Sequence, residues 1–144
     1  MEILIGGRKI PLFYSTYEMI AIQRDIGCTA YQLRDEVFGV VVSEDGDWEK
    51  NRYECMTDPA KTEKLGKLIR ILGNAGLDEK GEAADLTDKW VLRNIKPAMI
   101  VPYAMVLMTV IYEGNHIEEQ AKEEEKGPVD EILEEENAKK EPGE

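Results

Sequence analysis

Histidine and cysteine, the side chains that most often act as bases and nucleophiles near neutral pH, are scarce in this sequence. One histidine, His116, and two cysteines, Cys28 and Cys55, are present among 144 residues. The histidine lies at the edge of an acidic C-terminal segment and the cysteines lie in unrelated segments, so no nucleophile–base pair is indicated. Two cysteines are also too few for a disulfide framework. We interpret both as reduced thiols of a cytoplasmic protein.

Motifs that hold cofactors are lacking as well. The glycine pair Gly6-Gly7 is not followed by the start of a helix, which a phosphate-binding loop requires. The acidic run Glu44–Glu49 does not have the ligand register of a calcium loop. Because no histidine or other ligand type lies beside these carboxylates, a solvated loop is favoured over a catalytic pair. We therefore expect a protein that is not an enzyme and that holds no cofactor and no metal.

The chain also lacks a basic leader and a long apolar span. Met1-Glu2-Ile3 leads directly into a strand pattern, so no signal peptide is expected. The uncharged run from Ala98 to Tyr112 is shorter than the roughly 20 apolar residues that cross a bilayer. It is ended by Glu113 and Gly114, as in the helices of soluble proteins. We expect no membrane contact, and a central buried helix instead.

Positive charge is scarce, and negative charge is concentrated at one end of the chain. Lysine and arginine number 18 against 30 aspartates and glutamates, which gives a net charge of −12. Residues 113–144 hold 13 acidic and 4 basic residues, a net charge of −9, whereas residues 1–112 hold 17 and 14, a net charge of −3. This acidity argues against a nucleic-acid partner, because phosphates repel it.

A basic row is the one concentrated positive surface that the pattern predicts. Four cations recur at i, i+3 spacing on a predicted helix, namely Lys61, Lys64, Lys67 and Arg70. Such a row is usually a solvated helix face. In an acidic chain it is also a candidate protein-binding surface, on which the acidic tail would dock transiently.

The remaining pattern predicts a mainly α fold. We expect a small helical domain with an N-terminal β-hairpin over residues 1–114 and an acidic, marginally helical tail over residues 115–144. Alternating apolar residues on both sides of Gly6-Gly7 indicate the hairpin. Capping residues and helix-ending glycines or prolines delimit four helices, at Ser15–Gly27, Thr29–Phe38, Asp58–Gly76 and from Asp85 or Thr87 to Pro97.

Other segments are less clearly patterned. Val40–Val42 fits the end of a helix or a strand that enters a turn. The polar segment Ser43–Thr57 is interpreted as a loop, from which Trp48 and Tyr53 are expected to pack back onto the body. The tail offers few apolar side chains to bury, namely Ile117, Val129, Ile132 and Leu133. Its helices are therefore expected to be marginal alone.

The predicted central helix, residues 97–113, is apolar on all sides. At about 100° per residue, one side carries Ile100, Tyr103, Ala104, Leu107, Met108 and Ile111. The opposite side is milder but uncharged, and its residues Ala98, Pro102, Met105 and Thr109 are candidate protein-binding residues. A helix of this kind is either enclosed or shared with a partner. Burial within the monomer, a homodimer and a different protein partner are all open for the second side.

The order of the segments resembles that of a known family. The hairpin is followed by Asp25-Ile-Gly27, by Leu68-Ile-Arg-Ile-Leu-Gly-Asn-Ala-Gly76 and by Leu86-Thr-Asp-Lys-Trp-Val-Leu-Arg-Asn-Ile-Lys-Pro97, and the apolar helix closes at Tyr112-Glu-Gly114. Over residues 1–114 this order resembles the tail assembly chaperones of long-tailed phages and prophages. It rests on pattern and order, with no catalytic motif. The acidic tail is the least similar part.

The resemblance implies a non-enzymatic protein in the cytoplasm of a bacterial host cell. Members of the family bind the tape-measure protein while the tail tube is built around it, and they recruit tube subunits during virion morphogenesis. Shielding such a client requires uncharged surface on a stable small fold. The alternative is an acidic mimic of DNA or another inhibitory protein-binding module. That class would carry its carboxylates over a folded face, whereas here they collect in the tail.

Overall fold

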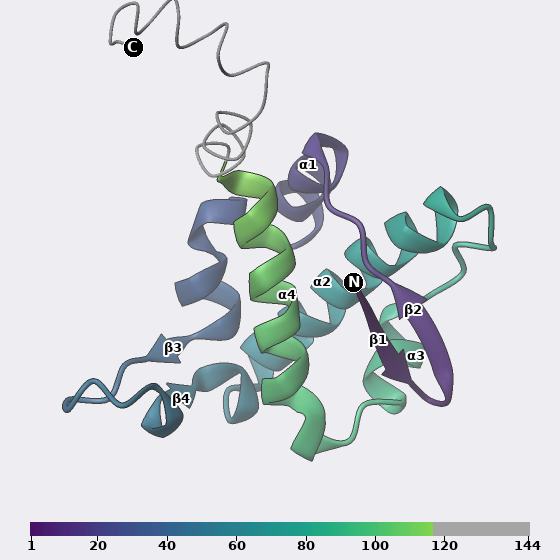
Figure 1. Cartoon of the computed structure of the whole chain (residues 1–144). Helices are drawn as coiled ribbons and strands as arrows, with labels where there is room; N and C mark the ends of the chain where they lie inside the picture. Colours follow the sequence, from purple (N-terminus) through teal and green to yellow (C-terminus); the bar gives the residue numbers. More distant parts are fainter. Residues whose placement is uncertain (117–144) are drawn as a thin grey trace, which may run out of the picture. The chain divides into compact units, whose positions relative to one another are not determined.

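The chain begins with a β-hairpin and continues mainly as helices, as the computed structural model shows for the residues that it describes, 1–116 (Figure 1). The elements are β1 (Glu2–Ile5), β2 (Arg8–Pro11), α1 (Thr16–Asp25), β3 (Val40–Val41), β4 (Arg52–Tyr53), α2 (Pro59–Glu79), α3 (Asp88–Arg93) and α4 (Ile100–Asn115). The predicted mainly helical class with an N-terminal hairpin is confirmed. Met1–Ile111 form one compact unit, and Tyr112 begins a second one. The predicted domain boundary after residue 114 stays a prediction, and the tail from Ile117 onward lies outside the described residues.

The first hairpin follows its glycine pair. β1 and β2 pair antiparallel from Glu2 opposite Pro11 to Ile5 opposite Arg8. Gly6 and Gly7 join the strands with φ angles of 57° and 79°, which lie in the left-handed region where residues other than glycine are strained. The apolar faces of the strands are buried in the core, which supplies the packing that an isolated hairpin lacks in water.

The capping residues set the helix starts as predicted. The backbone N–H of Ser15 donates to Glu18 Oε1 at 2.9 Å, and the Ser15 hydroxyl caps α1 in return. Asp58 accepts from the backbone N–H of Ala60 at 3.0 Å at the start of α2. Of the two residues considered for the cap of α3, Thr87 is the one that accepts, from the N–H of Trp90 at 3.1 Å.

The helix with the most neighbours is α2, which contacts α1, α3 and β2, and not the predicted central helix at residues 97–113. Its predicted core stripe of Leu65, Leu68, Ile69 and Leu72 is buried. The prediction that Gly76 ends the helix is wrong, because α2 continues to Glu79. Gly76 lies instead where the hairpin crosses the helix, and a Cβ atom there would lie 2.0 Å from the carbonyl oxygen of Pro11. Glycine is needed at this position for close approach of two backbones.

The segment between α1 and α2 departs from the predicted α-helix. Residues Ala30–Gln32 form a 3₁₀ turn and Arg34–Phe38 a π turn, which Gly39 ends in the left-handed region at a φ of 59°. Val40–Val41 is the strand β3, paired with β4, so the strand alternative is correct for these residues. Tyr53 packs against the core as expected. Trp48 does not, because 62% of its surface is exposed.

Candidate protein-binding site

The apolar helix begins with a 3₁₀ turn, Pro97–Met99, and continues as α4 to Asn115. One side of it is buried as predicted, with Ile100, Tyr103, Ala104, Leu107 and Ile111 in the core and Met108 half-buried against it. The Tyr103 hydroxyl donates to the carbonyl oxygen of Leu4 in β1. This hydrogen bond joins α4 to the N-terminal hairpin.

The opposite side of α4 is exposed. Ala98, Pro102, Met105 and Thr109 all face solvent, and the side chain of Met105 is 37% exposed. The Thr109 hydroxyl donates to the Met105 carbonyl oxygen at 3.0 Å, so its polar group is engaged within the helix. The described part of the monomer, residues 1–116, therefore does not bury this face. A homodimer and a different protein partner both stay open.

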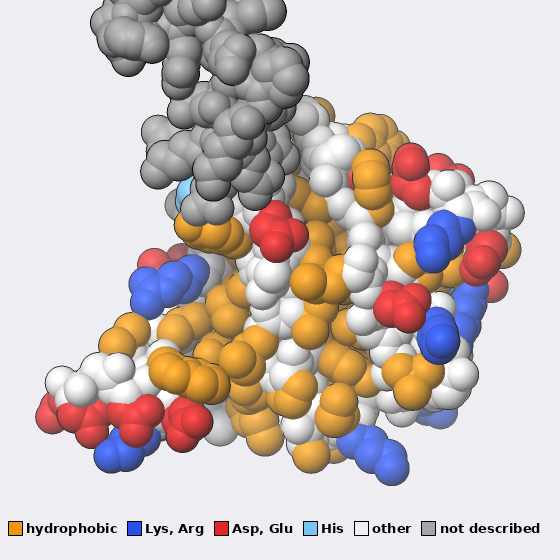
Figure 2. All heavy atoms as spheres, in the orientation of Figure 1, with side chains coloured by type: hydrophobic (Ala, Val, Ile, Leu, Met, Phe, Trp, Pro, Cys, Tyr) orange, Lys and Arg blue, Asp and Glu red, His pale blue; other side chains and the backbone are white. Residues whose placement is uncertain are grey.

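A groove lies beside this face. It has a volume of about 440 Å³, and it lies between α4, which contributes Val101 and Met105, and the segment from Trp48 to Thr57. A second pocket of about 430 Å³ shares Met56 and Thr57 with the groove and extends past the start of α4. Its apolar lining comprises Pro59, Leu65, Leu92, Ile95, Pro97 and Ile100. The two hollows adjoin, and hydrophobic side chains gather over the lower half of α4 with polar groups among them (Figure 2).

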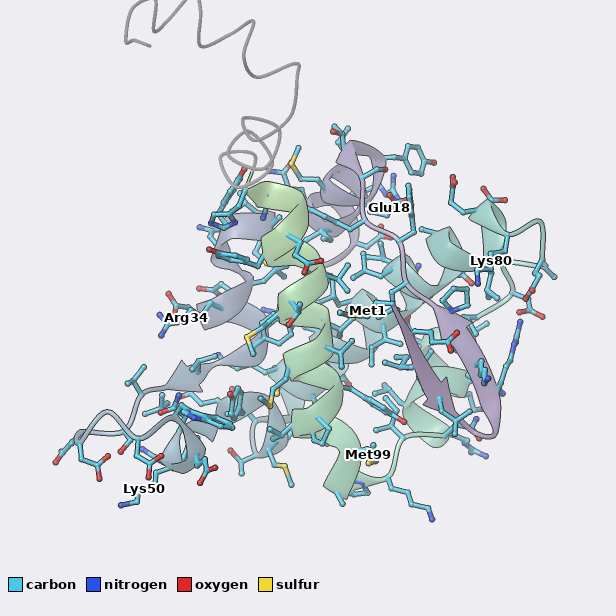
Figure 3. The ribbon with its side chains drawn as sticks, viewed as in Figure 1. Met1, Glu18, Arg34, Lys50, Lys80 and Met99 are labelled. Carbon is cyan, nitrogen blue, oxygen red and sulfur yellow. The ribbon has the colours of Figure 1, made fainter. Side chains whose placement is uncertain are left out.

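Methionine and tryptophan side chains supply much of that surface. Met56 and Met105 line the groove and are exposed, Trp48 stands at its rim, and Met99 is exposed nearby in the turn before α4. Figure 3 shows sulfur atoms along α4 and at its start, next to the labelled Met99. Methionine is flexible and polarisable, so a surface of this type adapts to the shape of an apolar partner. Large exposed apolar patches on small proteins commonly mark such interaction sites.

The loop at the far side of the groove is acidic. Glu49 and Glu54 line the groove itself, and Glu44, Asp45 and Asp47 precede them in the chain. The Ser43 hydroxyl, the Asp47 N–H and Lys50 all bond to the Asp45 carboxylate and lower its pKa to about 2. Carboxylates therefore gather at the end of this loop, beside the labelled Lys50 (Figures 2 and 3).

The basic row on α2 has partners of its own. Lys61 lies 3.7 Å from Glu54 and 3.8 Å from Asp58. Lys67 and Arg70 both bind Asp88 of α3, at 3.0 and 2.5 Å, and Arg70 also approaches Asp25 of α1. The row thus ties α2 to its neighbours, and a docking tail would have to compete with these carboxylates. Docking of the tail on Lys61, Lys64, Lys67 and Arg70 stays a prediction, since the tail lies beyond the described residues.

The charged cluster around Asp88 shifts the pKa values of two carboxyl groups in the same direction. Burial opposes ionisation of Asp88, but the hydrogen bonds from Arg70 and Lys67 more than offset it and lower its pKa. The hydrogen bond from Arg24, together with the charge of Arg70, lowers the pKa of Asp25. A carboxyl whose pKa is lower in the folded than in the unfolded protein stabilises the fold above its unfolded pKa. That contribution is lost as the pH falls through its folded pKa.

We predict that Asp88→Asn lowers the free energy of unfolding by roughly 1 to 2 kcal/mol at pH 7, since it removes two charge-assisted bonds and a carboxylate from the first turn of α3. The variant should also lose part of the decline in stability that the parent shows between about pH 5 and pH 2. Urea unfolding at several pH values measures both effects. Asp35→Asn, which removes an exposed carboxylate, is the control, and equal pH profiles for all three proteins would contradict the assignment.

The two thiols are buried, and neither lies in a reactive setting. Burial raises the pKa of Cys28 and of Cys55. A raised pKa keeps a cysteine in its protonated, poorly nucleophilic form. Among residues 1–116, no three side chains of the metal-binding types come together in a group that could hold an ion.

The expectation of no membrane contact stays a prediction. The uncharged run alone is too short to cross a membrane, but the helical stretch Pro97–Asn115 has 19 residues and is long and apolar enough by length and composition. Ala104 and Leu107 have no exposed surface, but only 22% of the most apolar 18-residue window is buried. α4 therefore packs one side into the core and leaves the rest exposed.

Sequence reasoning identified the face of α4 but not the other wall of the groove. Trp48 and Met56 come from a segment about 50 residues away along the chain, and nothing in the local pattern places them beside Met105. A tryptophan within a strongly acidic, turn-rich loop was the available signal, because that residue type is enriched where proteins bind one another. Comparisons of the chain with family models, with curated proteins and with solved structures gave no match.

Proposed function

We propose that the protein is a non-enzymatic tail assembly chaperone of a long-tailed phage or prophage. In this role it binds the tape-measure protein and helps to recruit tail tube subunits in the cytoplasm of the host cell. The observation that supports the proposal most is the bare, uncharged side of α4, with Met105 at its centre and an apolar groove next to it. The resemblance in the order of segments supplies the identity of the client.

The physical requirements of this role match the architecture of α4. A long helical client with apolar surface must be kept from aggregating until other subunits enclose it. That task needs apolar surface that stays in place when it is not occupied. The buried side of α4 provides this support, because Leu107 has no exposed surface and Tyr103 is bonded to β1. The exposed side can then present methionine to the client without collapse of the helix.

An acidic inhibitor that mimics DNA is the second candidate. The carboxylates of the loop Glu44–Glu49 favour it. A mimic of DNA, however, requires charge spread over the contact surface, since phosphate charge dominates recognition of nucleic acids. The groove next to this loop carries Glu49 and Glu54 on one wall, but apolar side chains such as Val101 and Met105 form the other. The chaperone proposal accounts for this apolar wall and the inhibitor proposal does not.

The proposal is tested first by gene order and then by co-purification. A tube-protein gene upstream and a very long tape-measure gene downstream are expected around the coding sequence. The tagged protein should retain the co-expressed tape-measure protein, and Met105→Asp should reduce the retained amount by roughly tenfold or more, because a charge is placed against an apolar partner. Tyr17→Asp, which changes an exposed aromatic residue on α1, is the control. Equal retention by Met105→Asp and the control would contradict a binding role for this face.

A further inference from the structure

We propose that the groove beside α4 binds a helix that is apolar on one side and carries lysine or arginine along its flanks. The inference rests on the proposed function, since it describes the segment of the client that this face would accept. It specifies the chemistry of the partner rather than its identity. Three observations support it, which concern the length of the face, the paired hollows and the charge of the rim.

The exposed side of α4 has the periodicity of a helix-binding surface. Ala98, Pro102, Met105 and Thr109 follow one another at spacings of three and four residues. At about 1.5 Å per residue they extend over roughly 17 Å, which is about three helical turns. A partner helix of about 12 residues covers that length, and it makes contact through positions i, i+3 or i+4, and i+7. An extended peptide would instead need the free edge of a strand, and the strand in the groove wall, β4, has only two residues.

The hollows define where the partner's apolar side chains go. The groove and the second pocket meet at Met56 and Thr57 and measure about 440 and 430 Å³. Each has room for a leucine or phenylalanine side chain. Met56, 43% exposed, stands between them and can change rotamer to fit either side chain. Two anchors in neighbouring pockets are typical of helices that bind in grooves.

The charge of the rim selects the sign of the partner's flanks. Glu49 and Glu54 line the groove, while the cations beside it are Arg52 in the lining, Lys50, which is held by Asp45 at 3.0 Å, and Lys61, which lies 3.7 Å from Glu54. With Glu44 and Asp47 in the same loop, the segment from Ser43 to Thr57 carries excess negative charge. Basic flanks on the partner would be attracted there and acidic flanks repelled.

The same charges argue against two other occupants. Residues 113–144 of the chain have a net charge of −9, so their apolar residues Ile132 and Leu133 would bring acidic neighbours to an acidic rim. A second copy of the chain, with a net charge of −12, would bring an identical acidic loop. Both remain outcomes that the experiment can detect.

The experiment uses the full chain and two synthetic peptides of about 18 residues. Both peptides carry leucine at the helix-face positions i, i+3, i+4 and i+7, and their other positions are mostly lysine in one and glutamate in the other. Binding is measured by calorimetry and by the fluorescence of Trp48, which is 62% exposed at the rim. We expect the lysine peptide to bind roughly tenfold or more tightly than the glutamate peptide at low salt. The difference should shrink between about 50 and 500 mM salt, because screening removes exposed charge interactions.

Two sets of substitutions test separately how the charge of the loop and the apolar face of α4 contribute to peptide binding. Replacing both Asp47 and Glu49 with lysine should reduce or reverse the preference between the peptides, and Met105→Asp should weaken the binding of both. If the parent protein bound the two peptides with equal affinity, the proposed selection of basic flanks would be overturned. The proposed function would still stand if the tape-measure protein co-purified. Binding of neither peptide while the tape-measure protein is retained would overturn the inference in full. If the tape-measure protein is also lost, the proposed function fails with it.

The competing occupants give distinct results. A concentration-dependent increase in mass by sedimentation that Met105→Asp abolishes would assign the face to a second copy. Peptide binding that occurs only when Ile132 and Leu133 are changed to serine would assign it to the chain's own tail. Either result would overturn the proposal of a basic partner helix.

Discussion

Replacing Leu107 with aspartate is expected to prevent folding, so that no cooperative melting transition remains. The Met105→Asp protein, in contrast, should melt within a few degrees of the parent protein. Leu107 has no exposed surface, while 37% of Met105 is exposed, although the two residues are separated by about a half-turn of the same helix. A charge left buried without a partner costs several kcal/mol, and small domains are stable by only about 5 to 15 kcal/mol. An aspartate at position 105 remains hydrated. Thermal melts followed by circular dichroism measure the difference.

The comparison of these two variants also tests the assignment of the faces. The helix propensity of aspartate is the same at both positions, so any difference reflects burial. If Met105→Asp unfolded the protein as fully as Leu107→Asp, the bare side of α4 would have to be part of the core, and the proposed binding face would be wrong.

Gly76→Ala is expected to lower the free energy of unfolding by about 3 kcal/mol or more. On an unobstructed helix the same change would add up to roughly 1 kcal/mol, because alanine has the higher helix propensity. Here the added Cβ would lie 2.0 Å from the carbonyl oxygen and 2.4 Å from the carbonyl carbon of Pro11. Both are backbone atoms of the hairpin, so the clash cannot be relieved by a rotamer change and must displace β2 from α2.

Gly66 on the same helix supplies the matched control. An alanine Cβ there would meet atoms of the Leu92 side chain, the nearest at 2.7 Å, and a leucine can rotate away. Gly66→Ala should therefore change stability much less than Gly76→Ala in urea unfolding. Similar losses in the two variants would mean that the hairpin does not cross α2 as closely as the structure has it.

Elements that depend on local chemistry could be predicted from the sequence. Gly6-Gly7, the capping box at Ser15 and the Asp58-Pro59 start act within a few residues, so each identified its element. The two sides of α4 followed from periodicity, because burial on one side of a helix repeats every turn.

Features that depend on distant parts of the chain could not be predicted. Gly76 has the same signature as a helix-ending glycine, and its role is decided by Pro11, which lies elsewhere in the sequence. The exposure of Trp48 depends in the same way on where its loop lies. The partners of the basic row, Asp25 and Asp88, come from two other helices. The fold class and the exposed side of α4 could thus be predicted from the sequence, whereas the groove beside that side could not.

The hydrogen bond between Tyr103 and Leu4 joins residues 99 positions apart, and this has a consequence for synthesis on the ribosome. At about 5 to 20 residues per second, Leu4 waits on the order of 5 to 20 s before Tyr103 is added. Throughout that interval the core has no α4 to close it, and closure of so long a loop carries an entropic cost that only the finished helix repays. The helix that bears the bare face is also the last of the described elements to be synthesised. The proposed binding surface therefore becomes available only after the hairpin and the helices α1 to α3 have been made.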